Sequence, residues 1–157
     1  MLAYRKILAP IDFSPCSLEA CRVAVALAEQ FKAELTVLHV IDIRVLESLA
    51  QVSERKVEEL KKLFHKRARL QLRSLLPEIP PGIRFQRRIA SGAPVSEIVS
   101  TIRTDEIDLI VMGRYGGTGE LEKIFFGSTV ERVVRLAPCA VLSVPLLPPS
   151  AGRRPNR

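Results

Sequence analysis

Two patterns alternate along this chain and leave few folds open to it. Short apolar runs alternate with longer segments in which apolar residues recur at three- and four-residue steps. The runs have the length of buried strands, and the steps place apolar side chains on one face of a helix. Strict alternation of strand and helix predicts a mostly parallel sheet with helices on both faces, joined by right-handed crossovers. The expected strands are residues 6–11, 35–41, 83–89, 108–112 and 140–144.

The first helix is expected to begin directly after the first strand, at Ser14 and Pro15. Ser14 can cap that helix, and Pro15 suits its first position because the missing N–H would have no partner there. The apolar steps stop at residues 32–34. Further helices are expected to open at Pro94 and at Ser128.

A long helix is expected from about residue 47 to residue 75, ended by a cluster of prolines, and residues 42–51 fit a loop that leads into it. Val57, Leu60 and Phe64 share one face of this helix. That apolar stripe is expected to pack on the sheet rather than to dock a partner.

The same helix carries Lys61, Lys62, Lys66, Arg67, Arg69 and Arg73. Glu58 and Glu59 accompany these cations, and Phe64 is the aromatic residue beside them. A dedicated nucleic-acid binder shows a concentrated basic face with aromatic residues for stacking. We therefore interpret the cluster as a solvated face and expect neither a specific nucleic acid nor a membrane as a partner.

Composition favours one domain. The 157 residues are 47% hydrophobic without any Trp, and the formal net charge of +7 suits an anionic ligand. Residues 1–146 are expected to form the domain, and residues 147–157, with three arginines, a flexible basic tail. Three cysteines without a CxxC pair argue against a disulfide framework, and we expect buried thiols. With no secretory signal or membrane-length apolar run in the sequence, a cytoplasmic setting is expected.

In such a sheet the ligand crevice lies beyond the carboxyl ends of the strands, where the winding reverses direction. Residues 9–12 and the glycine-rich segment 113–127 are suited to that place. Backbone N–H groups in a glycine-rich turn can cradle phosphate oxygens, and the N-terminus of the helix that opens at Gly127, Ser128 and Thr129 favours an anion. Arg114 and Lys123 are candidates for charge compensation.

Each of these features also has a structural interpretation. Ser128 and Glu131 have the spacing of a capping box, which needs no ligand. Asp12 can accept hydrogen bonds within the turn before the first helix. The four glycines between 113 and 119 can form a mobile loop. Taken together, on two loops at one edge of one sheet, the features favour phosphate binding.

The chain resembles the universal stress protein family over residues 4–145. The resemblance is carried by residues 7–14 (ILAPIDFS), 38–41 (LHVI), 92–94 (GAP), 108–113 (DLIVMG), 127–128 (GS) and 138–145 (PCAVLSVP). It implies a single doubly wound α/β domain with five parallel strands in the order 3-2-1-4-5. It also implies a homodimer that pairs through the last strand, residues 140–146.

In the nucleotide-binding branch of that family, ATP sits between the first and fourth strands. The resemblance implies that Pro10 and Asp12 border the adenosine and that Val40 lies beside the adenine. Met112, Gly113 and Gly116 would line the nucleotide, and Gly127, Ser128 and Thr129 would hold or adjoin the phosphates. ADP and AMP are alternative ligands, and Mg²⁺ can accompany the phosphates through Asp12.

The glycine spacing departs from the family's pattern, which is Gly, two residues, Gly, nine residues and then Gly-Ser or Gly-Thr. Gly113 and Gly116 match the first step, but ten residues separate Gly116 from Gly127. Gly117 restores the nine-residue step, but three residues instead of two then separate it from Gly113. We place the extra residue between Gly117 and Glu120, where glycines can absorb it.

No catalytic set stands out in the sequence. His39 is expected to be a hydrogen-bonded core residue, and His65 to be exposed on the charged helix. The glycine-rich segment lacks the Gly-Lys-Ser/Thr ending of a P-loop. A regulatory nucleotide-binding module is therefore the expected function. The alternatives are a slow ATP hydrolase and a dimeric interaction protein that binds no nucleotide.

Overall fold

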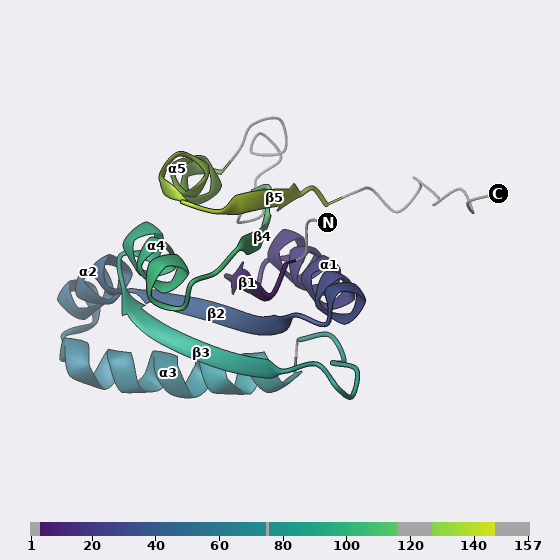
Figure 1. Ribbon diagram of the computed structural model, residues 1–157. Helices are drawn as coiled ribbons and strands as arrows, with labels where there is room; N and C mark the ends of the chain where they lie inside the picture. The colour runs from purple at the N-terminus through teal and green to yellow at the C-terminus, as the bar shows by residue number, and fades with distance from the viewer. Residues whose placement is uncertain (1–3, 75, 116–126, 147–157) are drawn as a thin grey trace.

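The computed structural model describes residues 4–74, 76–115 and 127–146. Within these residues five strands form one parallel sheet in the order β3-β2-β1-β4-β5 (Figure 1). This confirms the predicted fold class and strand order. The strands are β1 (Lys6–Ile11), β2 (Glu34–Asp42), β3 (Phe85–Gly92), β4 (Leu109–Gly113) and β5 (Ala140–Val144). The expected basic tail, residues 147–157, lies outside the described residues.

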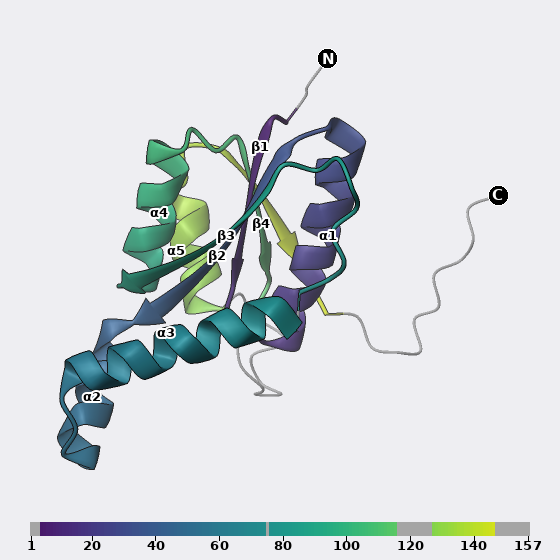
Figure 2. The ribbon, with the colours of Figure 1, turned by 90° about the horizontal axis from the view of Figure 1, so that it is seen from below.

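Helices cover both faces of the sheet, as the alternation predicts. On one face lie α1 (Pro15–Phe31) and α3 (Val57–Ser74), and on the other lie α4 (Pro94–Thr104) and α5 (Ser128–Leu136) (Figure 2). The remaining helix, α2 (Ile43–Ser53), projects past the end of β2. The described residues therefore build a three-layer sandwich with the sheet as its middle layer.

The start of α1 has the predicted cap. Ser14 has extended backbone, and its Oγ accepts a hydrogen bond from the Ser17 N–H at 3.2 Å. Pro15 occupies the first turn. The helix ends at Lys32, whose left-handed backbone lets its N–H reach the carbonyls of the last turn.

Alternate side chains of each central strand supply the two cores. In β1, Ile7 and Ala9 face α1, whereas Leu8 faces α4 and α5, and all three are fully buried. In β4, Val111 faces α1, whereas Ile110 faces α4 and α5. Burial on both faces explains why these strands are nearly continuous apolar runs in the sequence.

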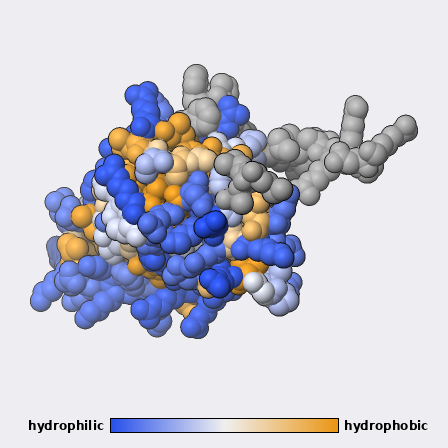
Figure 3. All heavy atoms as spheres, viewed as in Figure 1, coloured by the Kyte–Doolittle hydropathy of each residue, from blue (hydrophilic) through white to orange (hydrophobic). Residues whose placement is uncertain are grey.

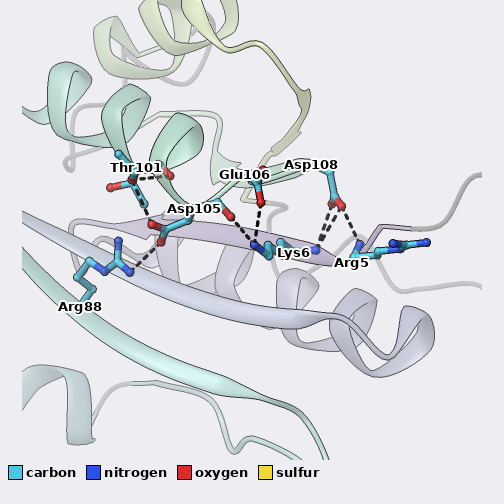
Figure 4. Close-up of polar contacts among 8 residues, drawn as sticks. Arg5, Lys6, Arg88, Thr101, Asp105, Glu106 and Asp108 are labelled. Carbon is cyan, nitrogen blue, oxygen red and sulfur yellow. Dashed lines mark hydrogen bonds and ion pairs between the residues drawn. The ribbon is translucent and has the colours of Figure 1, made fainter.

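A polar network fixes the amino ends of the strands (Figure 4). The Asp108 carboxylate accepts hydrogen bonds from the backbone N–H of Arg5 at 2.9 Å and of Lys6 at 3.3 Å. Lys6 Nζ donates to the Asp105 carbonyl at 2.9 Å, and Arg88 pairs with the Asp105 carboxylate at 2.8 Å. These contacts tie β1 to the segment that leads into β4.

The prediction of one helix from about residue 47 to residue 75, preceded by a loop, was wrong. The chain forms two helices, α2 and α3, separated by Glu54 in left-handed backbone with φ of 54°. The Asp42 side chain accepts a hydrogen bond from the Arg44 N–H at 3.0 Å, which starts α2 where a loop was expected. Leu46 then packs with Ile41 and Leu60 in a small separate core. Val57 and Phe64 also pack against this core, so the apolar stripe packs inward as predicted.

The thiols are free and none lies in a disulfide. Cys16 and Cys21 are buried, as predicted, and Cys139 is half-buried. Burial raises the pKa of Cys21 to about 11, against the smaller opposing effect of Arg22. Cys21 therefore packs as a small apolar side chain at neutral pH.

We predict that Leu46 anchors α2. Leu46 is fully buried, whereas Leu49 on the same helix is 40% exposed. Leu46→Ala should lower the free energy of unfolding by about 2–4 kcal/mol because it leaves a cavity, and Leu49→Ala by under about 1 kcal/mol. Urea unfolding followed by circular dichroism measures both. Equal losses for the two variants would contradict the anchoring role.

Candidate functional site

A cavity of about 650 Å³ opens at the carboxyl ends of β1, β2 and β4. The first turns of α4 and α5 complete its wall. This volume lies in the range of ligand pockets, about 300–1,000 Å³. The cavity occupies the place between β1 and β4 where the winding of the sheet reverses, as the sequence analysis predicts for a ligand crevice.

The cavity brings together eight of the nine predicted site residues. They are Pro10, Asp12, Val40, Met112, Gly113, Gly127, Ser128 and Thr129. The ninth, Gly116, lies outside the described residues. Two segments about a hundred residues apart in sequence thus meet at one edge of the sheet. That these residues bind a nucleotide stays a prediction.

The floor of the cavity is apolar and formed by core residues. Leu38, Met112, Ile98 and Val130 are at most 5% exposed, and they belong to the core between the sheet and the helices α4 and α5. Val40 continues this floor at the end of β2. A floor of this kind suits a flat apolar ring, because burying apolar surface is favourable without any directional contact.

Gly113 makes the closest backbone approach in this region. A Cβ at this position would lie 3.0 Å from the Cys16 carbonyl carbon and 3.0 Å from the Ser17 nitrogen. The end of β4 therefore packs directly on the first turn of α1, and only a glycine fits there without displacing backbone. Gly113 has this structural role in addition to its place in the cavity wall.

The N-terminus of α5 lies at the cavity, which Gly127, Ser128, Thr129 and Val130 line. Gly127 is the N-cap residue, so Ser128 is the first helical residue and no side chain caps the helix. The capping box of Ser128 with Glu131 does not form, because Glu131 instead pairs with Arg135 at 2.7 Å. Among the described residues, the N–H groups of Ser128, Thr129 and Val130 have no hydrogen-bond acceptor. Such an N-terminus attracts anions through its N–H groups and its dipole.

A hydrogen bond joins the two ends of the glycine-rich segment. The Gly127 N–H donates to the Arg114 carbonyl at 3.0 Å, and the Arg114 N–H donates to the Val144 carbonyl at 2.8 Å. This pairing sets the start of α5 beside the end of β4. Arg114, a candidate for charge compensation, does not line the cavity, and Lys123, the other candidate, lies outside the described residues.

Asp12 forms part of the turn between β1 and α1. Its Oδ1 accepts a hydrogen bond from the Ser14 N–H at 3.0 Å, so the structural interpretation of Asp12 is correct. The side chain is nevertheless exposed and lines the cavity. Oδ2 has no hydrogen-bond partner among the described residues, which leaves it available to a ligand hydroxyl or a cation.

His39 supports this turn from the other face of the sheet. Its Nδ1–H donates to the Ile11 carbonyl at 2.9 Å, which confirms the expected hydrogen bond, although the ring is half-buried and not part of the core. The ring packs on Phe13 with 4.5 Å between centroids. Phe13 has φ of 65°, a backbone conformation that bulky residues rarely adopt. The histidine therefore helps to hold the turn that places Asp12 in the cavity.

The expectation that His65 is exposed was wrong. His65 is partly buried, and its Nε2 lies 2.9 Å from the Ser91 Oγ on the edge strand β3. The residue lies on the side of α3 that turns toward the sheet, where a polar side chain needs a partner. Neither histidine lines the cavity.

The cavity is also lined by three residues that were not predicted from the sequence: Asp42, Ser17 and Tyr115. Asp42 is the last residue of β2, which lies beside β1. The expectation that ligand residues lie at the carboxyl ends of strands could therefore have identified it. Its Oδ2 lies 2.6 Å from Arg44 Nη2, and hydrogen bonds from Arg44 hold the pKa of Asp42 below its ordinary value. Tyr115 is 9% exposed and its hydroxyl donates to the Leu146 carbonyl at 3.2 Å. No pattern in the sequence marked Ser17 or Tyr115.

In the described part of the chain, no group of three His, Cys, Asp or Glu side chains is placed to hold a metal ion. Asp12 and Asp42 both line the cavity, but the Asp42 carboxylate is already paired with the Arg44 guanidinium. A divalent cation at this site would therefore need oxygen ligands from a bound molecule. No helix among the described residues has both the length and the hydropathy to cross a bilayer.

Comparisons with known proteins agree on one family. The model of the universal stress protein family matches residues 3–145. Universal stress protein MJ0531 of Methanocaldococcus jannaschii is 37% identical over 90% of this chain and 82% of its own. The solved structure of MJ0577, from the same organism, is similar with a TM-score of 0.80, 30% identity and coverage of 94% and 99%. A universal stress protein solved in complex with cAMP shares the fold, with a TM-score of 0.58, 22% identity and coverage of 91% and 97%.

We predict that His39 makes stability depend on pH. Burial lowers the pKa of His39, against smaller opposing effects of the Ile11 carbonyl and Asp12. The unfolded chain binds the proton more readily, with a pKa of about 6.5, so the free energy of unfolding should fall as pH decreases through that value. His39→Asn keeps a hydrogen-bond donor but cannot titrate. Urea unfolding between pH 5 and pH 8 should show a shallower pH slope for this variant, and an unchanged slope would contradict the assignment.

Proposed function

The chain belongs to the universal stress protein family, and on that premise we propose that it binds an adenine nucleotide, ATP first of all, in the cavity between β1 and β4. Binding would make it a regulatory module of a stress response. ADP and AMP are the alternative ligands. The proposal is carried by one observation: a single cavity joins an apolar floor to the uncapped N-terminus of α5.

The two ends of the cavity suit the two ends of a nucleotide. The apolar floor, which includes Val40 and Met112, fits the faces of a purine ring. The N–H groups of Ser128 and Thr129 and the hydroxyls of both residues can donate to phosphate oxygens. Asp12, at the end of β1, has a free carboxylate oxygen for a ribose hydroxyl. Gly116 is proposed to adjoin the phosphates, as the resemblance implies.

Charge balance favours Mg²⁺ as a companion of the phosphates. Among the described lining residues there are two carboxylates and no lysine or arginine. A triphosphate brings several negative charges, and the dipole of α5 supplies only about half a positive charge. Mg²⁺ bound by the phosphates and by Asp12 would supply the rest, and Lys123 is the other candidate.

The site supports binding better than hydrolysis. Hydrolysis needs a group that orients or deprotonates water near the terminal phosphate. Both histidines lie away from the cavity, and Arg44 holds the Asp42 carboxylate in an ion pair. We therefore propose a binding protein, with slow hydrolysis as an outcome to be measured by phosphate release.

We also propose that the chain forms a homodimer through β5. Among the described residues, this strand is at the edge of the sheet and pairs on one side, with β4. Leu142 and Leu146 are each 38% exposed on or beside this edge. An unpaired apolar edge is a template for a second strand, and a second copy would cover it.

The nucleotide proposal predicts that the affinity for ATP depends strongly on the residues at the start of α5. Calorimetry with ATP and Mg²⁺ should show binding by the natural chain, and Gly127→Val with Ser128→Ala should weaken it at least tenfold. The alanine removes a hydroxyl that can donate a hydrogen bond to a phosphate oxygen, and the valine side chain fills the space beside that hydroxyl. Titrations with ADP, AMP and cAMP rank the ligands, since cAMP occupies one solved protein with this fold.

Ser96→Ala is the matched control for this experiment. Ser96 is an exposed serine in the first turn of α4, and it does not line the cavity. The Ser96→Ala variant should bind ATP with an affinity within twofold of that of the natural chain. If the natural chain binds no adenine nucleotide and none is recovered by mass spectrometry of freshly purified protein, the interaction-only alternative replaces the proposal. If the double variant binds as well as the natural chain, the phosphate site is wrongly assigned.

The dimer proposal predicts that a charge on β5 separates the copies. Leu142→Lys should shift the mass measured by light scattering toward the monomer, because a lysine at the pairing edge opposes association. Leu49→Lys adds the same charge to an exposed leucine on α2 and should leave the mass unchanged. A natural chain that is monomeric at all concentrations would rule out the dimer.

A further inference from the structure

The exposed side of α3 carries a straight row of cations. Lys62, Lys66, Arg69 and Arg73 follow one another at steps of four, three and four residues, which places them on one side of the helix. All four are exposed, whereas Leu60, Ala68 and Leu72 on the opposite side are buried. The row spans about 16 Å along the helix axis. We call these four residues the basic row.

The basic row has no acidic partner in the described part of the chain. The five ion pairs found there all involve other residues. Glu58 and Glu59 lie in the first turn of α3, where a helix N-terminus favours acidic residues. From Lys61 to Arg73 the helix carries no carboxylate. The glutamates therefore precede the cations instead of alternating with them.

The basic row faces open solvent. A shallow hollow of about 610 Å³ runs along it, and residues of α3 alone form its wall. A hollow with one wall cannot enclose a small molecule. In Figures 1 and 3 the lower edge of the molecule, over α3, is a broad and mostly hydrophilic surface. Such a surface suits an extended anionic partner.

Two leucines beside the row indicate which kind of partner. Leu63 and Leu70 are 49% and 57% exposed, and both lie next to the basic row on the helix surface. Their exposed apolar surface gains nothing from phosphates on a nucleic acid, and no exposed aromatic residue on α3 offers stacking. At a lipid interface the same leucines can enter the region below the headgroups.

Against the expectation from the sequence that this cluster is only a solvated face without a membrane partner, we propose that the outer side of α3 binds the surface of an anionic lipid bilayer. The basic row contacts headgroup phosphates, and Leu63 and Leu70 insert at the boundary with the acyl chains. The helix lies in the plane of the membrane and does not cross it, in agreement with the absence of a spanning helix among the described residues. This role uses a surface distinct from the nucleotide cavity and does not depend on it.

Cosedimentation with vesicles tests the proposal, with phosphatidylcholine alone or with 30% phosphatidylserine, at low and high salt. The natural chain should bind the anionic vesicles at low salt and not the neutral ones. Replacing the basic row with glutamine should weaken binding at least tenfold, since each cation near an anionic surface contributes roughly fivefold. Absence of binding by the natural chain would overturn the proposal.

The matched control removes the same charge elsewhere. It replaces Arg5, Lys32, Arg103 and Arg132 with glutamine, all exposed and none on α3. Both quadruple variants keep the three arginines between residues 153 and 157. The control should bind within about threefold of the natural chain. If the control loses as much affinity for the anionic vesicles as the variant of the basic row, net charge alone explains the binding and the proposal fails.

A leucine variant separates lipid from nucleic acid. Leu63→Gln with Leu70→Gln leaves the charge unchanged and should weaken vesicle binding about threefold or more. The same proteins are titrated with a labelled DNA duplex at the same salt. A duplex bound more tightly than the vesicles, with no effect of the leucine variant on either, would overturn the proposal in favour of nucleic acid. Circular dichroism confirms that each variant keeps the fold.

Discussion

The reversal of winding between β1 and β4 is the constraint on which the rest of the structure depends. The helix that follows β1 packs on one face of the sheet, and the helix that follows β4 packs on the other. No crossover therefore covers the gap between their carboxyl ends. Leu8 and Ile110 pair in the interior of the sheet and are fully buried, and the cavity opens beyond them, at the carboxyl ends of the two strands. The polar network around Asp108 fixes the opposite ends of the same strands.

Much of this arrangement could be predicted from the sequence because it rests on local signals. Ser14 and Pro15 mark a helix start, and buried strands read as apolar runs, so β1, α1, α5 and β5 were predicted with nearly their final bounds. The break between α2 and α3 could not be predicted in that way. The sequence from about residue 47 to residue 75 favours helix without interruption, and the break depends on the left-handed backbone of Glu54 and on a tertiary contact of Leu46. The close approach of Gly113 to α1 is likewise a contact between distant segments, which no single stretch of sequence reveals.

The structure also changes the meaning of the net charge. The sequence analysis related a charge of +7 to an anionic ligand. The described lining of the cavity carries no lysine or arginine, so the proposed binding of phosphate there would rest on main-chain N–H groups at the start of α5. A large share of the positive charge lies instead on α3, outside the cavity. Anion binding at the cavity and anion binding at α3 are thus two separate physical questions.

The central claim is that free N–H groups at the start of α5 receive the phosphates of a nucleotide whose base lies on the apolar floor. Backbone NMR of the ¹⁵N-labelled chain during titration with ATP and Mg²⁺ tests it most directly. The account predicts the largest shifts at the amides of Ser128, Thr129 and Val130, with smaller ones at Val40 and Met112. Shifts confined to other parts of the molecule, or no shifts at saturating nucleotide, would contradict it.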